Sequence, residues 1–314
     1  MWLDDLLGLM TRIRRYRYHL IGVFAAALIV AGIAYPRPAD DRAPSSVSFG
    51  KMHYTIYHTS STDETIDVIK KHFTDPAAGN YLYEDTRAKA MFQSFDGKYK
   101  FIIAGTSYKE VTGIKFAIAK QYNFGPDDVI VYDIEDWPAT PSEESADVVG
   151  SIDAVMKAIR DQGYKAGVTP DYNMIVQNYK QIDWQNVDLL GMQIQRFTGD
   201  TERLVKWANE ISEYVKSVNP NTEVFAQVTF RQASNCYSWN ERPAVDPNCN
   251  VDVEQSLGRL EHSISEVAKI KTVDGFIVSY LPTDVTSIPR TPCPPELCNP
   301  RNLDRILSHI EDIE

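Results

Sequence analysis

Short β-favouring stretches alternate with amphipathic stretches from residue 53 to residue 310, and no other feature constrains the fold as strongly. Between the predicted strands, apolar residues recur every three or four positions, as expected of helices that bury one face. Val149, Ile152, Met156 and Ile159 are one such set. The predicted strands are residues 53–58, 91–95, 99–105, 129–132, 165–169, 188–195, 223–230 and 275–281, of which 91–95 is the least clear.

Eight strands separated by helices predict an α/β protein with a (β/α)₈ barrel, known as a TIM barrel, at residues 49–314. An open doubly wound sheet is the alternative. It fits less well because no glycine-rich phosphate-binding sequence follows a predicted strand, and Gly105 stands alone before Thr106. The few histidines form no ligand pair at helical spacing, so we expect neither a metal site nor a cofactor.

An uncharged run covers residues 20–35 and follows a segment, residues 1–19, with four arginines and two aspartates. This arrangement is typical of a transmembrane helix with a cytoplasmic N-terminus. We therefore predict a single-pass signal anchor in the cell membrane, then a linker rich in proline, aspartate and serine at residues 36–48, then an extracytoplasmic domain. Cleavage of a signal peptide after Ala34 is the alternative.

The formal net charge of the chain is −11, and removing the +2 of residues 1–19 leaves −13 on the exported part. A surface this acidic excludes nucleic acid as an expected partner and disfavours anionic lipid. The predicted contact with the membrane is therefore the N-terminal helix alone.

The four cysteines all lie in the last third of the chain, and their spacing pairs Cys236 with Cys249 and Cys293 with Cys298. Outside the cell, two local disulfides are the expected arrangement. Zinc binding is the alternative. It is disfavoured because neither pair has knuckle spacing and no histidine is near.

Acidic residues follow the apolar stretch 129–132, in the order Asp133, Ile134, Glu135, Asp136. Because side chains alternate along a strand, Asp133 and Glu135 are predicted to share one face, with Asp136 already in the loop. In a barrel this is the fourth strand, and its C-terminal end is where active sites form. The negative Asp133 would raise the pKa of Glu135 toward that of a working acid.

Other polar and aromatic residues are predicted to gather at the same rim of the barrel. Carboxylates serve acid–base chemistry, amides and hydroxyls bind sugar hydroxyls, and rings stack on sugars. The residues predicted to bind substrate are Asp136, Trp137, Tyr57, Asp171, Tyr172, Gln193, Gln195, Gln227 and Tyr280, and His58, Thr169, Thr229 and Ser279 lie at the same level.

The Asp133-Ile134-Glu135 sequence and the strand order resemble two families of TIM-barrel glycoside hydrolase, the family 18 chitinases and the family 25 lysozymes. The chitinase pattern Asp-x-x-Asp-x-Asp-x-Glu matches at Asp128, Asp133 and Glu135, with Val131 in place of its second acid, and its sixth-strand methionine matches Met192. The resemblance implies Glu135 as the acid and a substrate N-acetyl group as an internal nucleophile. The lysozymes place another aspartate on their first strand, where residues 53–58 hold none.

We therefore expect a membrane-anchored, extracytoplasmic glycoside hydrolase that acts on a cell-wall or surface glycan containing amino sugars, with Glu135 as general acid/base and Asp133 as its partner. The alternative is a catalytically silent barrel that binds polysaccharide or an envelope protein. Such a barrel would engage the two carboxylates with arginines such as Arg196 or Arg231, or would fill the mouth with side chains.

Overall fold

The parallel sheet closes on itself, because the first strand, β1 (His53–His58), pairs with the last barrel strand, β10 (Gly275–Tyr280). In this computed structural model the order around the barrel is β1-β10-β7-β6-β5-β4-β3-β2. A closed sheet leaves no unpaired edge. The predicted barrel is thus confirmed, and the open doubly wound sheet is excluded. The other barrel strands are β2 (Tyr81–Glu84), β3 (Lys100–Gly105), β4 (Val129–Tyr132), β5 (Lys165–Val168), β6 (Leu189–Met192) and β7 (Glu223–Thr229).

The structure describes residues 52–58, 62–75, 79–84, 100–234, 237–238, 244–245, 250–280 and 293–313. The predicted transmembrane segment at residues 20–35, its basic flank and the linker at 36–48 lie outside these ranges. Within them, no helix is both long enough and apolar enough to cross a bilayer.

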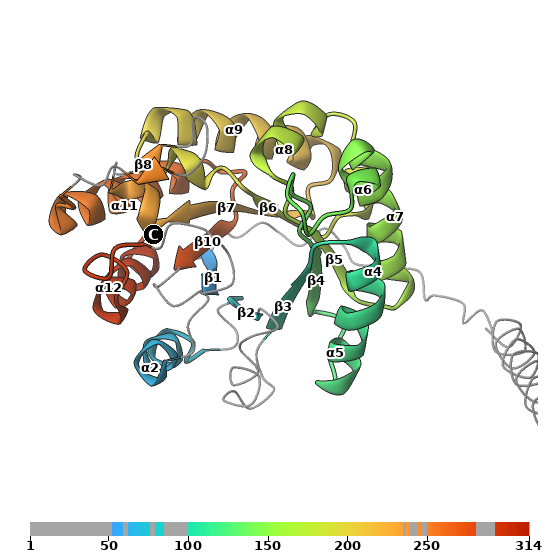
Figure 1. The fold of residues 1–314 in the computed structure, drawn as a ribbon, viewed down its shortest axis with the longest axis horizontal. Helices are drawn as coiled ribbons and strands as arrows, with labels where there is room; N and C mark the ends of the chain where they lie inside the picture. The colour runs from blue at the N-terminus through green and yellow to red at the C-terminus, as the bar shows by residue number, and fades with distance from the viewer. Residues whose placement is uncertain are drawn as a thin grey trace, which may run out of the picture. The chain divides into compact units, whose positions relative to one another are not determined.

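Helices surround the barrel and cover the outer faces of its strands (Figure 1). They are α2 (Asp63–His72), α4 (Tyr108–Glu110), α5 (Phe116–Gln121), α6 (Ser142–Ala146), α7 (Val148–Asp161), α8 (Tyr172–Asn178), α9 (Thr201–Val218), α10 (Phe230–Ala233), α11 (Val253–Ala268) and α12 (Pro300–Glu311). Short 3₁₀ turns occupy Trp184–Asn186 and Gln195–Phe197. A small antiparallel pair, β8 (Tyr237–Ser238) and β9 (Ala244–Val245), lies outside the barrel sheet.

Polar side chains at the helix starts explain where several helices begin. The side chain of Thr62 accepts a hydrogen bond from the Thr65 N–H at the start of α2. Asp147, Asp200 and Asp252 cap α7, α9 and α11 in the same way. Each cap satisfies a backbone N–H that has no partner within the helix.

The second barrel strand is β2 (Tyr81–Glu84), so the prediction of that strand at residues 91–95 was wrong. Residues 91–95 themselves lie outside the described part of the chain. The signal that was missed is the alternation in β2, where Tyr81 and Tyr83 pack inside the barrel and Leu82 packs among the residues outside it.

The helix after β3 is interrupted by a π-helical turn, Val111–Lys115, between α4 and α5. Simple helical spacing would place Val111, Ile114 and Ile118 together on its buried face. Val111 is fully buried, but Ile114 is 55% exposed. Because a π turn holds an extra residue, it displaces the side chains that simple helical spacing places together.

Apolar side chains pack in two regions, one inside the barrel and one between the strands and the helices. Inside, Val129, Val131 and Phe225 belong to a small buried cluster. Outside, the alternate residues Ile130 and Tyr132 belong to the large core beneath the helices. Each strand therefore sends side chains of one parity inward, and the parity decides which residues can reach the centre of the barrel.

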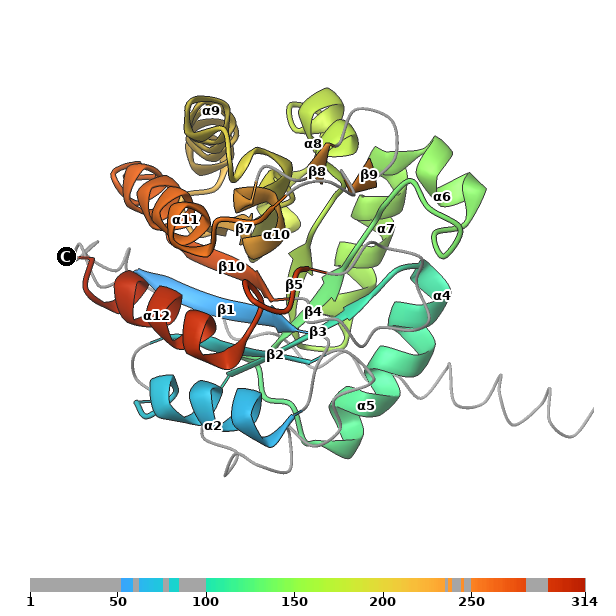
Figure 2. The ribbon, with the colours of Figure 1, turned by 60° about the vertical axis from the view of Figure 1, so that its left-hand side comes forward.

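Among the described residues, the first and last helices are α2 and α12, and they lie side by side in both views of the ribbon (Figures 1 and 2). Their contact includes hydrogen bonds of His72, whose ring nitrogens lie 2.7 Å from an Asp304 oxygen and 3.1 Å from a Glu311 oxygen. The contact between α2 and α12 thus joins the two ends of the described chain. The pairing of β1 with β10 joins the same two parts of the chain within the sheet.

Candidate active site

The residues after β4 keep the alternation of the strand beyond its last paired residue. Ile134 is fully buried in the outer core, whereas Asp133 and Glu135 on either side are partly exposed. The Asp133 N–H donates to the carbonyl of Gly105, which continues the pairing with β3 by one residue. The two carboxylates consequently turn toward the inside of the barrel, as their spacing predicts.

A cavity lies among the C-terminal ends of the barrel strands, with about 710 Å³ of space when its open mouth is included. Both carboxylates line it. Among the residues predicted for the site, Tyr57, Asp133, Glu135, Trp137, Gln193, Gln195 and Gln227 line this cavity, and so do Thr169, Thr229 and Ser279. The structure therefore brings together residues from β1, β7 and β10 and from the segments that follow β4, β5 and β6.

Asp133 is held by two neutral donors. The Thr169 hydroxyl donates to Oδ1 of Asp133 at 2.7 Å, and the Gln193 side-chain amide donates to the same oxygen at 2.8 Å. That amide also reaches the Thr169 carbonyl at 2.9 Å. Hydrogen bonds donated to a carboxylate fix its orientation, so the Asp133 side chain is held in one direction beside the cavity.

Gly191 of β6 makes room for this arrangement. A side chain there would collide with those of Thr169 and Ile277, both of which line the cavity. Glycine at this position therefore lets Thr169 stand close enough to donate to Asp133.

Four of the predicted substrate-binding residues lie elsewhere. Tyr280 has the wrong parity on β10 and is 1% exposed in the outer core, where its ring contacts that of Phe230. Asp171 caps α8 through the Asn173 N–H. The Tyr172 ring lies 4.3 Å from the guanidinium carbon of Arg196, and Asp136 is exposed in the loop. His58 lies in β1, and its side chain falls outside the described part of the structure.

Tyr83, Arg231 and Ile277 line the cavity although they were not predicted as site residues. Tyr83 was missed with its strand, and its ring packs edge-on against Tyr57 at 5.1 Å. Ile277 shares the parity of Ser279 on β10, which could have indicated its position. Arg231, expected only as a possible partner of the carboxylates, lies in α10 directly after β7 and is 6% exposed.

Asp128, which matches the first acid of the chitinase pattern, stands at the opposite end of β4. It accepts hydrogen bonds from the Phe101 N–H at 2.7 Å and the Gly125 N–H at 2.6 Å. Burial raises its pKa. Met192 is likewise buried in the outer core. Asp128 and Met192 therefore have structural roles away from the cavity. Of the residues that match the chitinase pattern, only Asp133 and Glu135 line the cavity.

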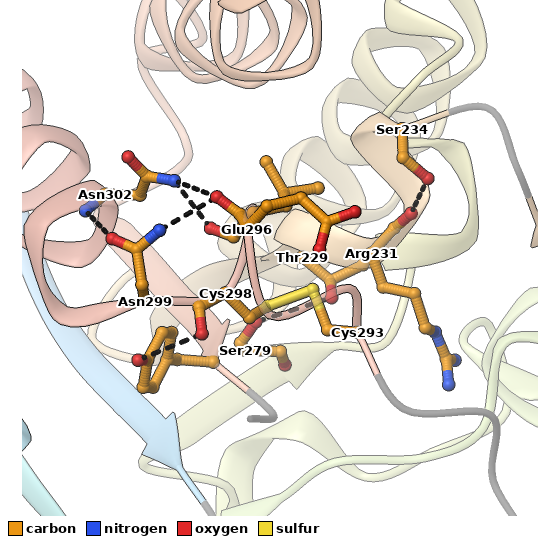
Figure 3. The surroundings of a disulfide bond; sticks show 11 residues. Thr229, Arg231, Ser234, Ser279, Cys293, Glu296, Cys298, Asn299 and Asn302 are labelled. Carbon is orange, nitrogen blue, oxygen red and sulfur yellow. Dashed lines mark hydrogen bonds between the residues drawn. A yellow bond between two sulfur atoms is a disulfide. The ribbon is translucent and has the colours of Figure 1, made fainter. Parts of the chain in front are cut away.

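The predicted disulfide between Cys293 and Cys298 is confirmed. Figure 3 shows it beside Ser279, close to the end of β10. The Tyr280 hydroxyl donates to the Cys298 carbonyl at 3.4 Å, which ties the loop to that strand. The other predicted pair, Cys236 and Cys249, lies outside the described residues.

No protein-family model and no curated protein matches this sequence. Among solved structures, the chain is similar to a complex of GH113 beta-1,4-mannanase, with 11% identity, a TM-score of 0.52, and coverage of 84% of this chain and 99% of that chain. It is also similar to a chitinase from Chromobacterium violaceum (11% identity, 73% and 93% coverage, TM-score 0.42) and to triosephosphate isomerase from Bartonella henselae (7%, 73% and 92%, 0.43). At this identity the likeness to the mannanase shows the barrel fold alone.

Proposed function

We propose that the barrel domain is a glycoside hydrolase in which Glu135 is the general acid/base and Asp133 is its partner. One observation carries the proposal: two carboxylates from one strand end line the same open cavity, and two neutral donors orient Asp133. The rest of the lining supports it. Three glutamine side chains and three hydroxyls can bind sugar hydroxyls, and Tyr57, Tyr83 and Trp137 can stack on sugar rings.

The chemistry follows from these two acids. Protonated Glu135 donates its proton to the glycosidic oxygen while the bond from that oxygen to the anomeric carbon breaks. The charged Asp133 stabilises the positive charge that develops on the sugar. Glu135, now ionised, then takes a proton from the water that completes hydrolysis.

The proposed substrate is a cell-wall or surface glycan that contains amino sugars. Its N-acetyl oxygen would attack the anomeric carbon, and Asp133 would accept a hydrogen bond from the acetamido N–H. This finer assignment is supported by the Asp-x-Glu arrangement that the chain shares with the chitinases. The N-terminal segment leads us to propose, further, that the enzyme acts outside the cell while anchored in the membrane.

The test is a screen of the chain from Ser45 onward against wall fragments and amino-sugar oligomers, with products read by mass. Glu135→Gln should lower turnover by about a hundredfold to ten-thousandfold and leave glycan binding intact, because the amide keeps the shape of the carboxyl group but is not an acid that can protonate the leaving oxygen. Asp136→Asn is the matched control, since Asp136 is an exposed acid of the same loop outside the cavity lining. It should hydrolyse at the normal rate.

Equal turnover by Glu135→Gln would exclude Glu135 as the catalytic acid. Binding of these oligomers without any cleavage by the unmodified protein would instead favour the catalytically silent barrel. Arg196, one of the cations that such a barrel could use, is engaged elsewhere, because it lies 3.5 Å from Asp171 and against the Tyr172 ring.

A further inference from the structure

The loop that carries Glu135 folds back on itself within a few residues. The Trp137 N–H donates to the Glu135 carbonyl at 3.0 Å, and the Thr140 N–H donates to the Trp137 carbonyl at 3.1 Å. These turns bring the Thr140 side chain, 5% exposed, back to the start of the loop. There the Glu135 N–H donates to the Thr140 hydroxyl oxygen at 3.3 Å.

The Thr140 hydroxyl also reaches across to the loop after β3. Its oxygen lies 3.1 Å from the Thr106 carbonyl. A carbonyl can only accept, so the hydroxyl donates its proton to Thr106 and accepts from the Glu135 N–H. One hydroxyl therefore links two neighbouring loops at the rim of the barrel, and both of its hydrogen-bonding roles are used.

The loop after β3 is itself anchored. The N–H and hydroxyl of Thr106 donate to one oxygen of Glu110 at 2.8 and 2.9 Å. The other Glu110 oxygen lies 3.1 Å from the ammonium of Lys115, whose side chain is 3% exposed. Burial raises the pKa of Glu110, but the hydrogen bonds from Thr106 and the charge of Lys115 outweigh it and hold the pKa below its ordinary value.

The π-helical turn has a place in this chain of contacts, because it contains Lys115. The turn follows directly on α4, which ends at Glu110. Single π-helical turns inside α-helices are frequently found at functional sites.

We propose that Thr140 is a positioning residue for Glu135. Its two hydrogen bonds fix the loop bearing the catalytic acid to the loop after β3, which the Glu110–Lys115 ion pair anchors. This inference rests on the proposed function. Thr140 itself touches no substrate, since it is absent from the cavity lining. It holds the backbone of Glu135 and so fixes the point from which the carboxyl reaches the scissile bond.

The test compares Thr140→Val with Thr140→Ser in the full chain. Valine keeps the shape of threonine but has no hydroxyl, whereas serine keeps the hydroxyl. Because a displacement of about 1 Å can reduce catalysis by about a hundredfold, Thr140→Val should lower kcat by about tenfold to a hundredfold. KM should stay within about threefold, since the groups that bind the sugar are unchanged. Thr140→Ser should restore most of kcat.

Amide hydrogen exchange of the peptide spanning residues 133–141 gives a readout independent of activity. The Glu135 amide should exchange at least about tenfold faster in Thr140→Val than in the unmodified or serine protein, because its acceptor is gone. Normal kcat in Thr140→Val, or a serine variant as slow as the valine variant, would overturn the proposal. If the unmodified protein cleaves no glycan, the proposed function fails. If hydrogen exchange of the Glu135 amide is unchanged in Thr140→Val, the proposed role of Thr140 fails independently of activity.

Discussion

Asp133 shows how single residues determine the site. Its position follows from the parity of β4, but its orientation depends on Thr169 and Gln193, which lie far along the chain, directly after β5 and β6. Buried donors of this kind contribute most when the acceptor is charged. The two donors should therefore affect catalysis more than they affect glycan binding.

Thr169→Val should reduce kcat/KM by about tenfold, which corresponds to about 1.4 kcal/mol of transition-state stabilisation. The substitution removes one hydrogen bond to Asp133 and leaves the side-chain volume nearly unchanged. Steady-state hydrolysis of an amino-sugar oligomer measures the effect.

The matched control is Thr222→Val. Thr222 is fully buried and donates to the Val187 carbonyl at 2.8 Å, but it lies before β7 at the opposite end of the barrel. It should lower stability by a similar amount and leave kcat/KM of the folded enzyme unchanged. Equal losses of activity in the two variants would mean that Thr169 acts only through stability.

At the scale of elements, the seam between α2 and α12 holds the first and last helices together. The Asp304 carboxylate lies 2.6 Å from the Lys71 ammonium and 2.7 Å from the His72 ring. On the same seam, the Tyr54 hydroxyl of β1 donates to Glu311 at 2.7 Å. Hydrogen bonds from Lys71 and then from His72 lower the pKa of Asp304.

This shift in pKa makes part of the stability depend on pH. A carboxyl with a lower pKa in the folded state stabilises the fold above its unfolded pKa of about 3.9, and the contribution is lost as pH falls through the folded value. Asp304→Asn should therefore lower the free energy of unfolding at neutral pH by about 0.5–1 kcal/mol, as expected for a partly exposed ion pair. The difference from the unmodified protein should vanish in strong acid.

Urea denaturation at a series of pH values measures that difference. Asp67→Asn on α2 is the control, because Asp67 is exposed to solvent, and it should change the free energy of unfolding only slightly. If the difference in the free energy of unfolding between Asp304→Asn and the unmodified protein stayed constant down to about pH 2, that result would contradict a role for the Asp304 charge.

At the scale of the molecule, polar groups from several strands also meet at the end of the barrel opposite the cavity. The Tyr81 hydroxyl donates to both oxygens of Glu223 at 2.9 and 3.0 Å, and Lys165 lies 3.6 Å from the same carboxylate. Burial and then the charge of Glu223 raise the pKa of Tyr81, so it stays a neutral donor. These contacts join the N-terminal ends of β2, β5 and β7.

The membrane anchor is the prediction that concerns the whole chain. The full chain should sediment with membranes and resist extraction at high salt, because an apolar run of this kind is held by the hydrophobic effect and not by charge. The chain from Ser45 onward should stay in the supernatant. Release of the full chain by salt alone, or a mature N-terminus after Ala34, would contradict the uncleaved anchor.

The sequence by itself determined the barrel, the order of most strands and the face on which Asp133 and Glu135 lie, because the alternation of apolar residues within each strand is local. Only the tertiary structure decided which rim residues share the cavity. Tyr280 points to the outer core and Tyr83 to the inside of the barrel. Which residues of a strand face inward depends on how that strand pairs with its neighbours. The contacts of Thr140 with Thr106 and of Asp133 with Gln193 join distant residues, and no local pattern encodes such contacts.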